Sequence, residues 1–479
     1  MTLNSAPEPD LDPENWDEFR ADAHQALDDM LGRLESIREG KVWQQAPAEV
    51  RAEFARGLPR APQDLSAVLD VFDQSIVPYS NGNGHPLFMG WVHGAGTPVG
   101  MVAEMLAAGL NSNCGGRNHI AIDVERQIVR WAAEMLSFPD ESSGVFVTGT
   151  SMANFLAVLV ARNAALGHDI RKKGLRSALQ LTAYASAQAH GCVIAAVELA
   201  GIGSDNLRLI PVDETGRLRI DLLKEAVVRD RAQGLQPFLI AGTAGTVNTG
   251  AIDDLAAIAD FARAEKLWFH IDGAFGALCA LSPKLRPLIA GLERADSVAF
   301  DFHKWAHVPY DAGFLLVRHP EMHRATFAAP MTYLSRAPSG LAAGEVWPCD
   351  LGPDLSRGFR ALKTWFTFRV FGTDRIGACI EHTCDVAKYL ESRLKQSKAY
   401  EVCAPVALNV VCFSLKSSSD GEANKRVVMD LHDSGDAAPS VTVLNGKPVI
   451  RCAIVNHRTT LRDIDTFMDA LDKAAARAG

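Results

Sequence analysis

The sequence lacks the features that mark a secreted, membrane-spanning or nucleic-acid-binding protein. Its nine cysteines are scattered over 479 residues without a CxxC pair, which favours free thiols in a reducing compartment over a disulfide framework or a zinc site. The first residues, MTLNSAPEPDLDPENWDEF, are acidic and have no apolar core, and no apolar run is long enough to cross a bilayer. A net charge of −9 leaves no basic surplus for nucleic acid or anionic lipid. These absences predict a cytoplasmic protein with no nucleic-acid or membrane partner, and nothing indicates a metal site.

A helical pattern comes before the main part of the chain. Between Trp16 and Arg38 the apolar residues recur at helical spacing, at Phe19, Ala23, Leu27, Met30, Leu31 and Leu34. The apolar face of such a helix needs something to cover it, and a partner subunit is one candidate.

Short apolar runs separated by helix-length segments begin at about His85. The runs are GVFVTG, LRLIPVD, PFLIAGTAG, LWFHID, DSVAFD and GFLLVR. Strands that are apolar on both faces and alternate with helices predict an α/β domain with a largely parallel sheet over residues 85–370. The segment WAHVPYDAGFLLVR predicts a tight turn into an antiparallel strand. From residue 371 to 479, a helix, three strands and a last helix predict a small α+β domain.

Two polar groups stand where predicted strands end. In VFVTGTSMANFLAVLV, residues 145–160, a strand leads through a small-residue turn into a helix. Thr150 and Ser151 would lie at the start of that helix, where N–H groups and hydroxyls suit a phosphate, although simple helix capping explains them equally well. Asp272 ends the apolar run LWFHID, where an ionised carboxylate is costly unless a cation or several donors meet it. A protonated heterocycle would serve, and capping of the next loop is the alternative.

Two further residues indicate a function only when they are considered together with the other motifs. His190 in AQAHGCV, and Lys304 between His303 and Trp305 in DSVAFDFHKWAH, would each be read as structural if taken alone. However, a phosphate turn, a carboxylate at a strand end, a flat histidine ring and a sequestered lysine in an α/β chain are what pyridoxal phosphate needs.

These motifs carry a family resemblance. DFHKW, HIDGAFGA, the histidine of AQAHGCV and RGFRALKTWFTFRVFG together resemble the group II pyridoxal-phosphate-dependent amino acid decarboxylases, which include the aromatic amino acid, histidine and glutamate decarboxylases. The resemblance runs from about His85 to the C-terminus. It implies the fold-type-I architecture, with a mostly parallel seven-stranded sheet and a small C-terminal α+β domain. It also implies a homodimer with active sites at the interface, in which an N-terminal helical segment, residues 1–84, wraps the partner.

The resemblance also implies roles for single residues. Lys304 would form the internal aldimine with pyridoxal 5'-phosphate, and we expect desolvation to lower the pKa of its amine. Asp272 would keep the pyridine nitrogen protonated, and His190 would stack on the ring and assist protonation. The remaining cofactor contacts would be the phosphate-binding Thr150 and Ser151, the positioning residues Asp301 and His303, and the ring-lining Thr246 and Ala274.

The departures from the family concern the substrate and the product. The stretch SGLAAGEVWPCDLG, residues 339–352, has no tyrosine, whereas the aromatic enzymes carry a proton-donating tyrosine on this loop; Tyr333 lies earlier. Decarboxylation to an amine, oxidative conversion to an aldehyde and a non-catalytic dimer are therefore three readings, and the intact set of Lys304, Asp272 and His190 speaks against the third. The predicted substrate contacts are His93, Arg117, Asn118 and His119. Of these, Arg117 is suited to bind a substrate carboxylate. For each of them the alternative is an ordinary surface position or a helix cap.

Overall fold

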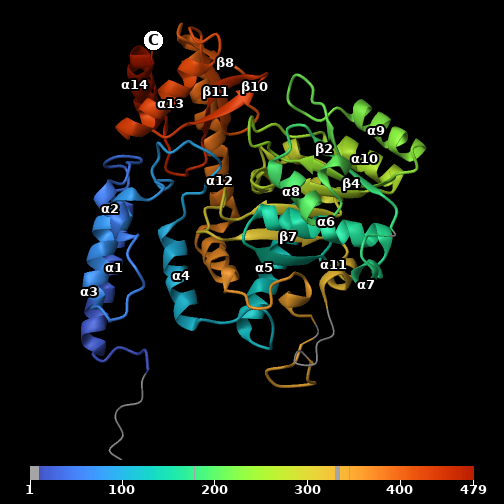
Figure 1. The fold of residues 1–479 in the computed structure, drawn as a ribbon, viewed down its shortest axis with the longest axis horizontal. Helices are drawn as coiled ribbons and strands as arrows, with labels where there is room; N and C mark the ends of the chain where they lie inside the picture. Colours follow the sequence, from blue (N-terminus) through green and yellow to red (C-terminus); the bar gives the residue numbers. More distant parts are fainter. Residues whose placement is uncertain (1–9, 177, 329–334, 345, 479) are drawn as a thin grey trace, which may run out of the picture.

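A computed structural model describes residues 10–176, 178–328, 335–344 and 346–478. Its larger part is built on a seven-stranded sheet with the order β1-β7-β6-β5-β4-β2-β3 (Figure 1). The strands β2 to β6 run parallel, and β7 is antiparallel to both β1 and β6. Their bounds are β1 Ser143–Val147, β2 Leu181–Ser186, β3 Leu207–Ile210, β4 Gln236–Thr243, β5 Trp268–Asp272, β6 Ser297–Asp301 and β7 Gly313–Val317.

Helices cover both faces of this sheet, which explains why its strands are apolar on both sides. On one face α6 packs against β4 to β7 and against α8, and on the other α5, α9 and α10 cover the strands. The bounds of the helices around this sheet are α4 Pro98–Leu110, α5 Ile120–Leu136, α6 Thr150–Leu166, α7 Ile170–Lys173, α8 Gly191–Leu199, α9 Ile220–Ala232, α10 Leu255–Glu265 and α11 Pro320–Phe327.

The α/β fold class and six strands of the sheet are confirmed, including the antiparallel strand β7 after the predicted tight turn. The sequence interpretation missed the central strand β2. Its sequence, LTAYAS, contains small residues and little of the β-branched content that marks the other strands. Burial of all six residues between α6, α8 and the neighbouring strands holds this segment in the sheet.

The C-terminal part forms a second sheet, which is antiparallel and has the order β10-β11-β9-β8. Its strands are β8 Tyr400–Val402, β9 Val410–Leu415, β10 Ser440–Leu444 and β11 Lys447–Ala453, with the helices α13 Glu422–Ser434 and α14 Leu461–Ala478. Phe413, Phe467 and Leu471 contribute to a core of its own. The long α12, Arg360–Gln396, is interrupted at Gly372, which takes a positive φ of 70°. Figure 1 shows α12 running from beside the large sheet to the C-terminal sheet.

Three N-terminal helices lie along one side of the molecule, away from the large sheet (Figure 1). They are α1 Trp16–Glu35, α2 Ala48–Glu53 and α3 Leu65–Val71, and none of them has a buried residue. The helix predicted from Trp16 is confirmed, but it ends at Glu35, because Ser36 caps it and leaves the helical conformation. Among the described residues, no helix is both long and apolar enough to span a bilayer.

Candidate active site

The predicted chemistry converges on one cavity of about 550 Å³. It lies at the carboxyl ends of the parallel strands, because Thr243, Asp272 and Asp301 are the last residues of β4, β5 and β6. Open α/β sheets bind their ligands at this edge. Of the predicted site residues, the cavity lining contains His93, Thr150, Ser151, His190, Asp272, Ala274, Asp301, His303 and Lys304.

Asp272 is buried at the end of β5. Its Oδ1 accepts a hydrogen bond from the Ala274 N–H at 3.3 Å, and the Cys192 thiol lies 3.8 Å from its Oδ2. Burial raises the pKa of this carboxyl, while the positive charges of Lys304 and His190 act in the opposite direction. The carboxylate is therefore a strong acceptor that a protonated ring nitrogen in the cavity would satisfy.

Lys304 forms an ion pair with Asp301, with 2.9 Å between Nζ and Oδ2. The expected lowering of its pKa is wrong for the protein alone. Burial is the largest single effect and lowers the pKa of the amine, but the charge and hydrogen bond of Asp301 and the charge of Asp272 together outweigh it, so the pKa lies above its ordinary value. Sequence reasoning considered desolvation only, and it missed that the carboxylate three residues earlier turns back onto the lysine.

Asp301 also caps α6, because its Oδ1 accepts the Thr150 N–H at 2.7 Å. The first free N–H of this helix is thus used within the protein. The Thr150 hydroxyl is different: Oγ1 is buried and has no hydrogen-bond partner among the described residues. An orphaned hydroxyl beside Ser151 at a helix N-terminus fits a phosphate, which would supply the missing acceptor.

Two histidines of the cavity have fixed orientations. The Nδ1 atom of His190 accepts the Cys192 N–H at 3.2 Å and so caps α8. The Nδ1 atom of His303 accepts the Ala312 N–H at 3.0 Å, and burial lowers the pKa of His303 to about 4. His303 is therefore neutral at physiological pH, and its hydrogen lies on Nε2, which is 3.6 Å from Oδ2 of Asp301.

An aromatic wall completes the cavity, and part of it was missed from the sequence. Tyr310 lines the cavity, with its ring centroid 4.3 Å from that of His303. His93 stacks on Trp91 at 5.8 Å and meets the edge of Tyr310 at 6.4 Å. Tyr310 lies six residues after Lys304, in the turn before β7, and a tyrosine so close to the lysine was the available signal.

Other predicted residues lie elsewhere. Thr246 is buried, and its hydroxyl bonds Thr249 and the Ala251 N–H rather than lining the cavity. Arg117 stacks on Trp347, and the side chains of the next two predicted contacts bond backbone carbonyls, Asn118 that of Gly340 and His119 that of Asn113. None of these four is among the residues that line the cavity within one chain. Tyr333 lies outside the described residues.

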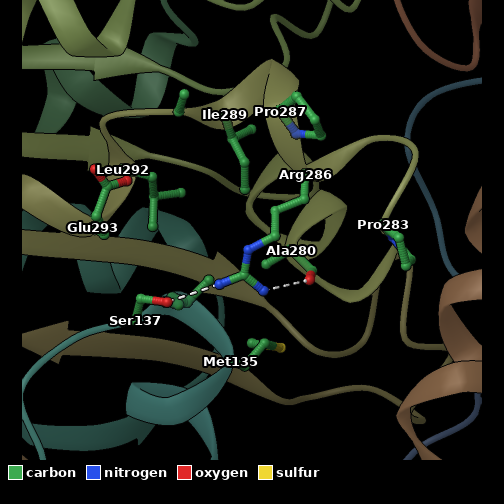
Figure 2. A pocket seen from close by; sticks show the side chains of 11 residues that line it. Met135, Ser137, Ala280, Pro283, Arg286, Pro287, Ile289, Leu292 and Glu293 are labelled. Atoms are coloured by element: carbon green, nitrogen blue, oxygen red, sulfur yellow. Dashed lines mark hydrogen bonds between the residues drawn. The ribbon is translucent and has the colours of Figure 1, made fainter.

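A second cavity, of about 390 Å³, has a different character (Figure 2). It lies beside the C-terminal end of α5, and its lining is largely apolar, with Met135, Ile289 and Leu292 among its side chains. The Arg286 guanidinium reaches across it and donates to the Ser137 hydroxyl at 2.7 Å and the Ala280 carbonyl at 3.1 Å. Its one cationic group is thus engaged within the protein.

The cavity around Lys304 combines a primary amine, an anionic partner for a ring nitrogen and donors for a phosphate on an α/β scaffold. This combination defines a pyridoxal-phosphate-dependent enzyme. Residues 47–416 match the family described as pyridoxal-dependent decarboxylase conserved domain. The chain is 33% identical, over 94% of both sequences, to an aromatic-L-amino-acid decarboxylase of Bacillus atrophaeus. It is 28% identical, over 93% of both, to a phenylacetaldehyde synthase of Arabidopsis thaliana.

Solved structures agree with this assignment. The crystal structure of Oryza sativa TDC with PLP and tryptamine superposes with a TM-score of 0.89 at 25% identity, covering 98% of this chain and 99% of that one. The chain therefore belongs to the pyridoxal-dependent decarboxylase family. It is an amino acid decarboxylase, a carboxy-lyase with pyridoxal phosphate as cofactor, and its fold is the predicted fold-type-I architecture.

Proposed function

We propose that Lys304 binds the cofactor aldehyde covalently and that Asp272 pairs with its pyridine nitrogen, while an L-amino acid loses its carboxylate above them. The observation that carries this proposal is the placement of the lysine and the buried strand-end carboxylate in one cavity. Pyridoxal phosphate, when bound, supplies an electron sink for the electron pair that carbon dioxide leaves behind. Asp272 supports that sink, because its charge favours a protonated ring nitrogen.

Asp301 lies beside the amine that must react and holds its proton in the protein alone. The amine must lose this proton before it can attack an aldehyde, and Oδ2 of Asp301, 2.9 Å from Nζ, is placed to receive it. His190 is proposed to lie against the cofactor ring and to assist protonation, since its capping bond at Nδ1 directs Nε2 into the cavity. Thr150 and Ser151 would hold the phosphate and His303 would fix the cofactor beside it. Ala274 and, through its loop, Thr246 would border the ring.

The substrate we propose is an aromatic L-amino acid that bears a polar ring group. Trp91, His93 and Tyr310 provide flat surfaces for a ring. The side-chain nitrogen of Asn81 lies 3.4 Å from Nδ1 of His93. Burial, followed by the charge of Lys304, lowers the pKa of His93. The neutral His93 ring can therefore form a hydrogen bond with the polar group of the substrate ring. Relatives that are named decarboxylases of tyrosine, tryptophan and histidine support this class.

Carbon dioxide release from a panel of L-amino acids tests the proposal, with Lys304→Ala as the background. We expect tyrosine or a similar polar aromatic substrate to give the highest kcat/KM. In the His93→Leu variant this preference over phenylalanine should shrink. Absence of carbon dioxide release from every member of the panel would refute the proposed function, and a preference for acidic substrates would refute the proposed substrate class.

A second outcome, an aldehyde product, has specific support. The stretch 339–352 contains no tyrosine, and the relatives include a phenylacetaldehyde synthase. In that reaction one oxygen molecule and one water molecule are consumed, and ammonia and hydrogen peroxide leave with carbon dioxide and the aldehyde. The cavity, however, contains the phenol of Tyr310, whose pKa burial raises above its ordinary value, so this group keeps its proton and can donate it. We favour the amine, and oxygen uptake equal to carbon dioxide release would overturn that choice.

We also propose a cytoplasmic homodimer with three parts, residues 1–84, 85–370 and 371–479. The exposed apolar side chains Trp16, Phe19 and Leu31 of α1 support a partner-covered N-terminal segment, and the break at Gly372 supports the last boundary.

The nine cysteines are free thiols, which suits a reducing compartment. Contacts of Arg117, Asn118 and His119 with substrate would then require the partner subunit. Mass measurement in solution tests the dimer: Phe19→Asp with Leu31→Asp should favour monomers, and a monomeric wild-type protein would refute it.

A further inference from the structure

Behind Asp272 a row of buried polar side chains leads away from the cavity. Trp268, His270 and Asp272 alternate along β5 and therefore point to the same face of the sheet. That face is covered by α6, which carries Asn154, and by α8, which carries Cys192. Ser297 pairs with His270 across the neighbouring strand β6. Asn154, His270 and Ser297 are each at most 1% exposed.

We infer that these side chains form a one-directional chain of hydrogen bonds, in which Cys192 and Asn154 are the positioning residues that fix the Asp272 carboxylate toward the cofactor ring. The inference rests on the proposed pairing of Asp272 with the pyridine nitrogen. Its links are Trp268 Nε1 to Ser297 Oγ at 2.9 Å, Ser297 Oγ to His270 Nδ1 at 2.9 Å, His270 Nε2 to Asn154 Oδ1 at 2.7 Å, Asn154 Nδ2 to Cys192 Sγ at 3.1 Å, and Cys192 Sγ to Asp272 Oδ2 at 3.8 Å.

The chemistry of the groups fixes the direction of this chain. The indole N–H of Trp268 can only donate and an ionised Asp272 can only accept. Burial lowers the pKa of His270 to about 3, so its ring is neutral and carries one N–H. Because Oδ1 of Asn154 can only accept, that hydrogen lies on Nε2 of His270, and Nδ1 accepts from the Ser297 hydroxyl.

The Cys192 thiol, at the end of this row of hydrogen bonds, also keeps its proton. Burial, followed by the charge of Asp272, raises the pKa of Cys192 to about 12. The S–H group is therefore available as a donor toward Oδ2. Contact with the Asn154 amide also lowers the pKa of Asp272, against the larger effect of burial. Each group thus donates toward the carboxylate, and removing a link should make Asp272 a stronger base that takes more of the proton it shares with the ring nitrogen.

The position of that proton can be measured directly. Apoenzyme is reconstituted with pyridoxal phosphate labelled with ¹⁵N in the ring, and the nitrogen resonance is recorded at one fixed pH. Cys192→Ala should move the signal toward the unprotonated ring and lower kcat by roughly threefold to tenfold, the size of one modest hydrogen bond. Cys192→Ser, which keeps a donor, should restore the wild-type signal. Asn154→Leu, which removes two links, should move it further.

Two further variants make the result unambiguous. Cys384→Ala removes a buried thiol from α12, outside the chain of hydrogen bonds, and should leave the nitrogen signal and kcat at their wild-type values. Asp272→Ala should move the signal fully. If Asp272→Ala moves it while Cys192→Ala and Asn154→Leu do not, the inference is overturned and the proposed function stands. If Asp272→Ala has no effect, the pairing with the ring nitrogen fails, and the inference fails with it.

Discussion

The ion pair between Asp301 and Lys304 gives the sharpest quantitative prediction. Asp301→Asn keeps the size of the side chain and an oxygen that can accept the Thr150 N–H, but it removes the charge. At 2.9 Å between Nζ and Oδ2, and with an effective dielectric constant of ~20, the lost Coulomb energy is about 6 kcal/mol. That figure is an upper bound, because the lysine side chain is 22% exposed and water screens the charges. We expect the pKa of Lys304 to fall, because the charge that favours its protonated form is lost.

The pKa shift can be followed through the reactivity of the apoenzyme. Pyridoxal without its phosphate avoids repulsion between Asp301 and a second anion, and its addition to the amine is monitored by absorbance against pH. The rate rises with pH as the amine loses its proton, so the curve of Asp301→Asn should lie at lower pH than that of the wild type. Reaction at other lysines is subtracted with Lys304→Ala.

A matched control has the same change in net charge at a distance from the site. Asp385→Asn removes a carboxylate that is half exposed and pairs with Lys284 at 2.8 Å, and its curve should coincide with that of the wild type. If the Asp301→Asn curve also coincides with the wild type, Asp301 does not hold the proton of Lys304, and the argument from their ion pair is refuted.

Two further predictions concern the ring nitrogen and the pH dependence of stability. Asp272→Ala should weaken cofactor binding and slow turnover by about 100-fold or more, because a charge-assisted bond and the electron sink are lost together. A variant with the same cofactor dissociation constant and the same kcat as the wild type would contradict this prediction. Burial lowers the pKa of His323 to about 4, so the unfolded chain, with a value near 6.5, takes up a proton first on acidification. The contribution of neutral His323 to the free energy of unfolding is complete above pH 6.5. As the pH falls towards 4 this contribution, about 3 kcal/mol, is lost. His323→Gln should flatten urea-measured stability over that range, and an unchanged slope would show that His323 is not responsible.

The parts of the site that the sequence predicted are those that depend on local pattern. Asp272 and Asp301 end strands that read as apolar runs, and the parallel sheet then brings their side chains to one edge. Thr150 and Ser151 begin a helix immediately after a strand. Such residues need only correct element types and strand direction to meet in space.

The parts that were missed depend on tertiary contact. The pKa of Lys304 is set by the side chain that turns onto it as well as by burial. The strand β2 is held by burial on both faces rather than by β propensity. His270 meets Asn154, 116 residues away in sequence, and no local spacing signals that pair. Thr246 shows the converse, since this residue was predicted to line the cofactor ring, but its hydroxyl forms hydrogen bonds within its own loop.

The proposed function depends on Lys304 as the residue that carries pyridoxal phosphate. Borohydride reduction of the holoenzyme makes the bond between lysine and cofactor permanent, and peptide mass spectrometry then locates it. We expect one phosphopyridoxyl group per chain, on Lys304 within DFHKWAH. A label on another lysine, or a reduced holoenzyme without any label, would contradict it.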